Sequence, residues 1–181
     1  MKNEISTGTL LISKPFMEDK RFEKTIILIV EHNKNGSIGL IINRNSLFNA
    51  KDIIPEINMS DINIKEGGPV EKDALFFIHK HPHLIPNSQK IKDKLYFGGD
   101  MKQLIKSIQQ NQIKINDIIF FIGYSGWDKK QLEEEIEEGS WITHNINLER
   151  IFEKIEWSNI LIEFNQDFEV WASAPSDFHL N

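Results

Sequence analysis

Cysteine is absent from this chain of 181 residues. Disulfide bonds, thiolate metal ligands and a cysteine nucleophile are therefore excluded. Long hydrophobic runs are also absent. The longest apolar stretches, such as 26–30 and 74–78, have the length of strands and fall far short of the roughly 18 residues of a membrane helix. We therefore expect a cytoplasmic protein without membrane contact, folded as one domain over residues 1–181.

Acidic residues outnumber basic ones. The chain has 21 Lys and Arg and 27 Asp and Glu, which gives a net charge of −6. A negative chain repels the phosphates of nucleic acids unless its basic residues gather on one face. Lys90, Lys92 and Lys94 alternate along one segment, and we interpret them as a charged edge strand that discourages pairing with another chain. Direct nucleic-acid binding is not expected.

The pattern of apolar and turn-forming residues predicts an α+β fold. A turn at 33–36 joins the first two strands, and most later strands follow one another without helical crossovers, which favours α+β over regular βαβ winding. The predicted strands cover 26–31, 38–43, 74–79, 94–97, 117–124, 159–164 and 169–172. The predicted helices cover 47–57, 101–110, 129–138 and 148–157.

The stretch Gly123-Tyr124-Ser125-Gly126-Trp127 lies between an apolar strand and a predicted helix. An α/β-hydrolase carries its nucleophile there, in the motif G-x-S-x-G. The bulky Trp127 occupies the position of the last glycine, and a triad in hydrolase order would need Asp177 and His179, two residues apart in a polar tail. We therefore expect Ser125 to be a small residue in a structural turn.

Three histidines, His79, His81 and His83, alternate along the chain, so an extended strand would present them on one side, as in some zinc sites. A proline interrupts the strand and no acidic partner follows at a telling spacing. We interpret these histidines as a solvated strand end and expect neither a metal nor another cofactor. His32 is a candidate general base beside Glu31, although adjacent strand residues point to opposite faces.

Two helix starts share one pattern, an aspartate followed three residues later by glutamine. Asp100 and Asp128 are therefore predicted to cap the helices that follow them. Each carboxylate already meets the positive end of its helix, which leaves no place for a phosphate. The phosphate-binding motifs G-x-x-x-x-G-K-[ST] and G-x-G-x-x-G are also absent.

The predicted helix 129–138 carries lysines first and acids afterwards, the reverse of the order that the helix dipole favours. Lys129 and Lys130 occupy the predicted first turn. One interpretation is a solvated face without a function. The other is an acidic face kept for a basic partner, formed by Glu133, Glu134, Glu137 and Glu138.

Several of these motifs together resemble the YqgE/AlgH family of bacterial proteins, over nearly the whole chain. The resemblance rests on Glu31-His32-Asn33 with Gly36, Gly39-Leu40 leading to Asn43-Arg44, Gly67-Gly68-Pro69-Val70, His79, and Gly123-Tyr124 with Gly126-Trp127 and Gln131-Leu132-Glu133. It implies a bent, mostly antiparallel sheet that closes into a pseudo-barrel with helices packed outside. It implies no established activity, and the AlgH half of the name comes from a link to regulation of alginate production.

Our leading hypothesis is a non-enzymatic bacterial protein that acts through a protein partner or a small ligand. One alternative is a hydrolase-like enzyme that uses His32, His79 or Ser125, and another is a transcriptional regulator, which needs a basic face. The candidate binding residues are Glu31, His32, Asn43, Arg44, Gly68, His79, Tyr124 and Trp127. A structural role is the alternative for each of them, for example an ion pair between Arg44 and Glu31.

Overall fold

Nine strands form one large sheet in the computed structural model, which describes residues 5–48, 50–57, 62 and 64–172. Within these ranges the order is β6-β7-β5-β8-β3-β2-β1-β9, and β4 pairs with β8 beside this path. The strands are β1 (Leu10–Ser13), β2 (Ile26–Asn33), β3 (Gly36–Ile41), β4 (Ile64–Glu66), β5 (Val70–His79), β6 (Gln89–Lys92), β7 (Leu95–Phe97), β8 (Ile118–Asp128) and β9 (Trp141–His144).

Short helices lie between and after the strands. The α-helices are α1 (Ala50–Ile53), α2 (Met101–Gln109), α3 (Gln131–Glu137), α4 (Trp157–Phe164) and α5 (Glu169–Ala172), and 3-10 turns cover Lys20–Phe22, Ile115–Asp117, Leu148–Phe152 and Gln166–Phe168. No helix within the described ranges has the length and apolar composition that crossing a bilayer requires. The α+β class expected from the sequence is confirmed, with a large and mostly antiparallel sheet.

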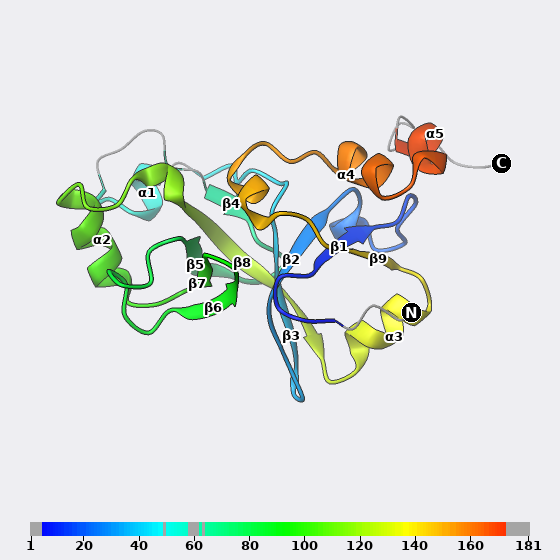
Figure 1. The fold of residues 1–181 in the computed structure, drawn as a ribbon, viewed down its shortest axis with the longest axis horizontal. Helices are drawn as coiled ribbons and strands as arrows, with labels where there is room; N and C mark the ends of the chain where they lie inside the picture. The colour runs from blue at the N-terminus through cyan, green and yellow to red at the C-terminus, as the bar shows by residue number, and fades with distance from the viewer. Residues whose placement is uncertain (1–4, 49, 58–61, 63, 173–181) are drawn as a thin grey trace.

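Strand β8 connects the two halves of the molecule (Figure 1). Its first part pairs antiparallel with β5 on one side and parallel with β4 on the other, and its last four residues pair with the start of β3. The continuation of β3 then pairs with β4, through the bridge between Asn45 and Lys65. One strand therefore fixes the position of both halves.

The sheet is open, so the expected pseudo-barrel is wrong. Among the described strands, β6 pairs only with β7 and β9 only with β1, and Figure 1 shows these two edges on opposite sides of the molecule. The edges diverge because β8 pairs with β5 along one part of its length and with β3 along another. The interpretation of an edge strand rich in lysine is confirmed for β6, where Lys90 and Lys92 are exposed.

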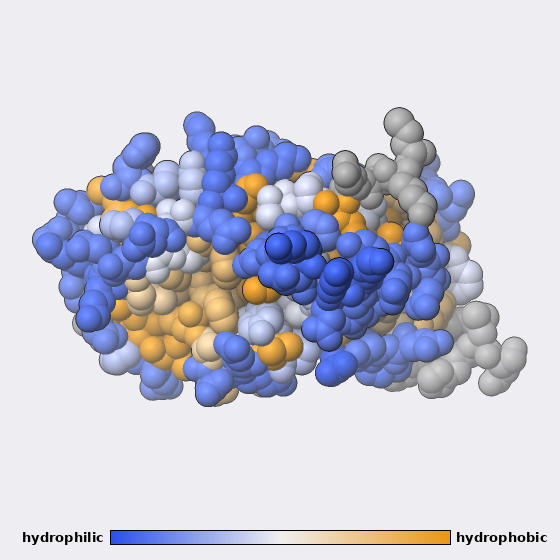
Figure 2. All heavy atoms as spheres, turned by 90° about the horizontal axis from the view of Figure 1, so that it is seen from below, coloured by the Kyte–Doolittle hydropathy of each residue, from blue (hydrophilic) through white to orange (hydrophobic). Residues whose placement is uncertain are grey.

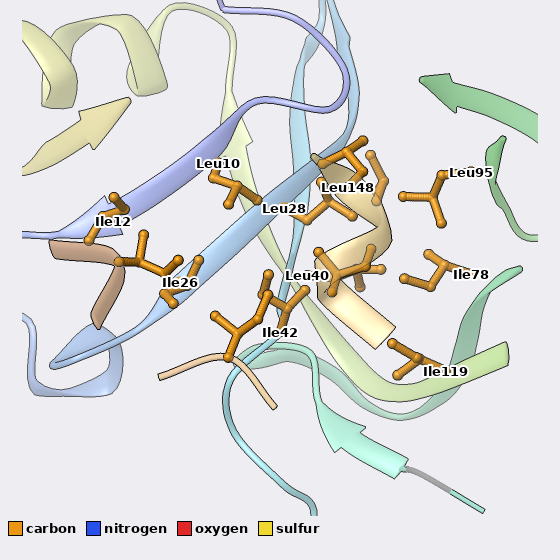
Figure 3. Close-up of a cluster of buried hydrophobic side chains, with 14 of the residues drawn as sticks. Leu10, Ile12, Ile26, Leu28, Leu40, Ile42, Ile78, Leu95, Ile119 and Leu148 are labelled. Carbon is orange, nitrogen blue, oxygen red and sulfur yellow. The ribbon is translucent and has the colours of Figure 1, made fainter. Parts of the chain in front are cut away.

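The main hydrophobic core lies on one face of the sheet (Figure 3). Side chains from β1, β2, β3, β5, β7 and β8 converge there on Leu148 and on α4. Alternation along β2 divides its residues between two layers, because successive side chains point to opposite faces. Ile26 and Leu28 join the main core, whereas Ile27 and Ile29 join a smaller cluster under α3.

Two predicted strands near the C-terminus, 159–164 and 169–172, are helices in the structure. They correspond to α4 and α5. The apolar run of α4 suggested a strand, but Trp157, Ile160 and Leu161 follow the spacing i, i+3, i+4 and are all buried. That spacing lets a helix bury one face against the main core, and a helix therefore forms.

The predicted turn at 123–127 is wrong, because β8 continues without a break to Asp128. The predicted helix after it is shorter than expected and begins only at Gln131. Lys130 precedes it with φ +67°, so neither Lys129 nor Lys130 lies in its first turn. The small residues of this segment allow close contact with another backbone, as described below for Gly68, and they make no chain reversal.

The two predicted helix caps differ. Asp100 accepts a hydrogen bond from the backbone N–H of Gln103 and caps α2 as expected. Asp128 does not cap α3. The N–H of Asp128 instead donates to the side chain of Gln131, because the strand continues up to this residue.

Other differences concern short elements. The predicted helix 47–57 is reduced to α1 among its described residues, and the predicted helix 148–157 is a 3-10 turn that ends at Phe152. Strands β1, β4 and β9 were not predicted. Each has only three or four residues, too few for a period of two to stand out.

Gly68 is required by the close packing of two backbones. Its φ is +155°, and a Cβ atom placed on it would lie 2.2 Å from the carbonyl carbon of Tyr124. Gly98 has φ +62°, but a Cβ atom there would meet nothing within 4 Å. Gly68 therefore has a structural role in this fold, whatever else it contributes.

We predict that Gly68→Ala lowers the free energy of unfolding by about 2–6 kcal/mol, since backbone strain and overpacking each contribute about 1–3 kcal/mol. The matched variant Gly98→Ala has strain without a clash and is expected to lose about 1–2 kcal/mol. Urea unfolding of both variants measures the difference. Equal losses would contradict the role assigned to the contact with β8.

Candidate functional site

A groove of about 380 Å³ lies on one face of β2, β3 and β8, at the end of the sheet that carries the β2–β3 hairpin. Three of the candidate residues, Glu31, Tyr124 and Trp127, line it. The face of the molecule around the hairpin tip and α3 is largely hydrophilic, whereas an apolar area lies over the half that holds α2 (Figure 2). Three of the eight predicted candidate residues therefore meet in the groove.

Strand register explains which side chains share the groove. Glu31 pairs with Ile38 and Ile38 with Gly126, while Asn33 pairs with Gly36 and Gly36 with Asp128. Paired residues in a sheet lie on the same face. Two rows of residues therefore run across the three strands. Each row contains one glycine, and the missing side chain at that position deepens the groove.

Gly36 also brings β3 close to β8. A Cβ atom on Gly36 would lie 2.2 Å from the carbonyl oxygen of Trp127. At Gly126 a Cβ atom would lie 3.1 Å from the ring of Tyr124, which forms one wall of the groove. A side chain at either position would displace a strand or the tyrosine ring, so both glycines help to keep the groove open.

The groove carries negative charge. Glu31 and Asp128 line it, and no Lys, Arg or His does. The carboxylate of Glu31 accepts a hydrogen bond of 2.7 Å from the side chain of Asn33, which orients it. Tyr124 is half-buried, its ring packs edge-on against Phe76, and its hydroxyl has no hydrogen-bond partner among the described residues. The groove can therefore accept hydrogen bonds from a cationic group.

His32 points away from the groove, as expected for the neighbour of Glu31 on a strand. Its Nδ1 lies 2.8 Å from the hydroxyl of Ser37 on the paired strand. Trp127 likewise points its indole ring to the opposite face, where it packs with Phe22 and Trp141. Trp127 therefore forms part of the groove floor, while its indole ring belongs to the hydrophobic core on the other face.

A carboxylate between two indole rings joins this region to α3. Glu135 accepts hydrogen bonds from the indole N–H groups of Trp127, at 2.9 Å, and of Trp141, at 2.8 Å. Its other oxygen accepts from the side chain of Gln131. This arrangement holds α3 against β8 and β9. It also leaves the candidate acidic face exposed to solvent, and that face comprises Glu133, Glu134, Glu137 and Glu138.

Asn43 and Arg44 lie outside the groove and hold the segment before β2. The side chain of Asn43 accepts from the N–H of Ile26 and donates to the carbonyl of Lys24. Arg44 donates to the carbonyls of Arg21 and Glu23. The ion pair considered between Arg44 and Glu31 is not formed, because Arg44 lies 3.9 Å from Glu66 instead.

His79 lies at the end of β5 and is fully buried, so its interpretation as part of a solvated strand end is wrong. Its Nδ1 accepts from the N–H of His81 at 3.0 Å, and its Nε2 lies 3.1 Å from the carbonyl of Gly98. Burial lowers the pKa of His79 to about 4; the contact with Gly98 opposes this shift and the charge of His81 adds to it. His79 is therefore neutral at pH 7, with the proton on Nε2.

His81 and His83 do not join His79 in one site. His81 lies 3.0 Å from the carboxylate of Asp117, and His83 is exposed. Across the described ranges no three His, Asp or Glu side chains gather as a metal site would require.

Ser125 is fully buried within β8, and its hydroxyl donates to the carbonyl of Gly67 at 3.2 Å. Among the described residues, no histidine or carboxylate forms a hydrogen bond with it. Asp177 and His179, the other members of the triad considered above, lie outside the described residues. The hydroxyl contacts a backbone, as expected for a small structural residue.

Some groove residues were missed from the sequence. Asp128 and Gly126 belong to the strand that was expected to end before them, so the alternation from Tyr124 to Asp128 was not used. Continuing the period of two through these residues would have placed both beside Tyr124. Asn35, in the hairpin turn, offers no such signal.

Comparison with known proteins confirms the resemblance. The sequence profile of the AlgH-like family, DUF179, matches residues 10–169. The chain belongs to the AlgH-like family. A UPF0301 protein of Cytophaga hutchinsonii is 36% identical over 98% of this chain and 100% of its own length. A UPF0301 protein of Bacteroides fragilis is 38% identical over 97% of this chain and 91% of its own.

Two solved structures share the AlgH-like fold. The solution structure of the AlgH protein from Pseudomonas aeruginosa has a TM-score of 0.74 and 24% identity, covering 99% of this chain and 100% of that protein. The crystal structure of protein DIP2367 from Corynebacterium diphtheriae has a TM-score of 0.77 and 19% identity, covering 96% and 95%. These likenesses establish the fold.

We predict that acid lowers the stability of this AlgH-like protein through His79. Burying neutral His79 contributes fully to the free energy of unfolding above the pKa of histidine in the unfolded chain, about 6.5. This contribution is lost as the pH falls towards the pKa of His79 in the folded protein, about 4. The loss between pH 7 and pH 4 is about 3 kcal/mol. His79→Gln cannot titrate and is expected to lose that much less over the same range in urea unfolding. An equal loss in both proteins would contradict this assignment.

We predict that Glu135→Ala lowers the free energy of unfolding by about 2–4 kcal/mol, because two buried indole N–H groups lose their acceptor. The control Glu134→Ala removes an exposed acid from the same helix and is expected to change stability by less than about 0.5 kcal/mol. Chemical unfolding followed by tryptophan fluorescence measures both. If the two variants are equally stable, the carboxylate does not hold α3.

Proposed function

We propose that this protein is a non-enzymatic, cytoplasmic binding protein whose groove on β2, β3 and β8 takes a basic segment of a partner protein. The observation that carries the proposal is the meeting of Glu31, Tyr124 and Asp128 on one face, in a groove that no basic side chain lines. A lysine or arginine side chain placed there would meet two carboxylates and a free phenol hydroxyl.

The size and composition of the groove favour a peptide segment. A volume of about 380 Å³ holds one or two long side chains. The backbone of the hairpin, together with Asn33 and Asn35, offers donors and acceptors beside them. An aromatic wall, here Tyr124, is typical of protein recognition surfaces, where tyrosine contributes contact area and a polar tip.

The exposed acids of α3 support the same partner chemistry. Glu133, Glu134, Glu137 and Glu138 lie on the helix that follows the groove strand, at the same end of the molecule (Figure 1). Such a field raises the rate at which a basic partner meets the protein. It also repels nucleic-acid phosphates, which argues against a regulator that binds DNA directly.

The rival hydrolase hypothesis gains little from the geometry. Its three residues, His32, His79 and Ser125, form no hydrogen bonds with one another. His79 and Ser125 are buried, and each is hydrogen-bonded to a backbone carbonyl. His32 contacts Ser37 on the other face of the sheet from the groove. Binding without a covalent step is the simpler proposal.

A short peptide of alternating lysine, arginine and glycine tests this function. We predict that it shifts the amide NMR signals of Glu31, Tyr124 and Asp128, and that the affinity falls as salt is raised. The double variant Glu31→Gln/Asp128→Asn is expected to bind at least about tenfold more weakly, since each lost charge-assisted contact is worth about 1.5–3 kcal/mol.

The control Asp52→Asn/Glu56→Gln makes the same change in charge at exposed positions in and after α1. An equal loss of affinity in this control would show that only net charge matters and would contradict the proposed site. Signal changes confined to other surfaces, or tighter binding of a single-stranded oligonucleotide than of the peptide, would also contradict it.

A further inference from the structure

A second pocket of about 380 Å³ lies apart from the groove, between the start of α4, β4 and the segments that flank β2 and β3. Three lysines line it, against one glutamate. The proposed function does not use this pocket, and none of the residues that line the groove lines it. Its chemistry is the opposite of that of the groove.

Lys65 is the most unusual residue of this pocket. It lies on β4 between Ile64, which packs into the core beneath α2, and Glu66. Alternation turns its side chain to the other face of the strand, towards the pocket. Only 5% of Lys65 is exposed, and within the described ranges its ammonium group has neither a hydrogen bond nor an ion pair.

An ammonium group that has lost much of its water without gaining a counter-charge is unfavourable. Burial accordingly lowers the pKa of Lys65. A bound anion would supply the missing counter-charge. Such an isolated charge beside a pocket is a frequent mark of a functional site.

The other charges of the pocket strengthen its positive character. Lys24 lies with its ammonium group 5.8 Å from the ring centre of Trp157, and it lines the pocket. Lys154 also lines it and is paired with Glu156, the one acid of the lining, at 2.6 Å. The one acid of the lining is therefore paired with Lys154 and not with Lys65.

The N-terminus of α4 opens onto the same pocket. This helix has eight residues, and the side chain of Glu156 at its N-cap makes no capping hydrogen bond. Trp157 and Ser158, in the first turn, line the pocket. The first N–H groups of a helix have no partner within the helix, and the dipole is positive there. Because Glu156 does not cap these N–H groups and its charge is paired with Lys154, they stay open to an added anion.

We propose that this pocket binds the carboxylate or phosphate group of a small metabolite, held by Lys65 and the N-terminus of α4. A pocket of this volume is in the range that small ligands occupy. Residues 173–181 lie outside the described part of the chain, and their sequence contains Asp177. A carboxylate of the chain itself is therefore the other source of the same chemistry, and the experiment separates the two.

The experiment uses the full-length protein, with inorganic phosphate and acetate as probes. NMR of the Cε signal of Lys65 reports its pKa with and without each anion. An anion that binds only the charged form raises that pKa by about one unit when its concentration is ten times its dissociation constant. Phosphate or acetate is expected to cause this rise.

Lys65→Met provides the matched variant. Methionine keeps an unbranched apolar chain and removes the unpaired, partly desolvated charge, so the variant is expected to be at least as stable as the natural protein. Its affinity for the anion, measured by calorimetry, is expected to fall at least about tenfold, because one charge-assisted contact is lost. Lys102→Met removes an exposed lysine from α2 and is expected to keep full affinity.

Three results would overturn the proposal. The first is a pKa of Lys65 that neither anion changes, and the second is an anion affinity that is the same in Lys65→Met and the natural protein. The third is a pKa of Lys65 that falls in Asp177→Asn without any added anion, which would assign the pocket to the chain's own carboxylate. None of these results bears on the binding of a basic peptide in the groove, so the two proposals fail or hold separately.

Discussion

The contact between the backbone at Gly67 and Gly68 and the backbone of β8 is the constraint on which the two halves of this protein depend. Gly67 donates to the carbonyl of Ile122 and accepts from the N–H of Ile41 and from the hydroxyl of Ser125. It thereby joins β3 to β8 at the point where β8 changes its partner. A Cβ atom on Gly67 would lie 2.2 Å from the carbonyl oxygen of Gly123, so the strands meet this closely only because no side chain intervenes.

The same close packing shapes both candidate sites. On one side of the contact, β8 continues past β5 and supplies Tyr124 and Asp128 to the groove. On the other side, β4 is held parallel to β8, which turns Lys65 into the second pocket. The acidic groove and the pocket lined by lysines therefore depend on the same backbone contacts, and a shift of β8 would alter both.

Much of the fold could be predicted where the signal is local. The hairpin of β2 and β3, the strand from Ile118 and the cap at Asp100 follow from strand alternation, turn residues and capping chemistry. The continuation of β8 to Asp128 could not be predicted from the sequence. Glycine and serine are typical of turns and also of strands whose backbones lie close together, and only the tertiary structure distinguishes the two uses. The helix α4 was missed because the consecutive apolar residues 160–162 also fit a short strand.

The candidate site was predicted in part for the same reason. Glu31 and Tyr124 were found because they belong to motifs of the family, but so do Asn43 and Arg44, which hold the segment before β2. Motif residues combine binding and folding roles, and a sequence does not separate them. Lys65 carries no sequence signal at all, since a lysine on a strand of three residues looks like any exposed lysine.

The pairing of β1 with β9 has a consequence for synthesis of the chain. Leu10 pairs with His144, and the indole N–H of Trp157 donates to the carbonyl of Ser13, 144 residues away in sequence. Most of the chain must therefore be synthesised before β9 can pair with the free edge of β1. Contacts of such long range slow folding, and an uncovered apolar edge is open to other chains in the meantime. β1 and β2 can therefore pair early in synthesis, while the other edge of β1 stays uncovered until residues 141–144 have been made.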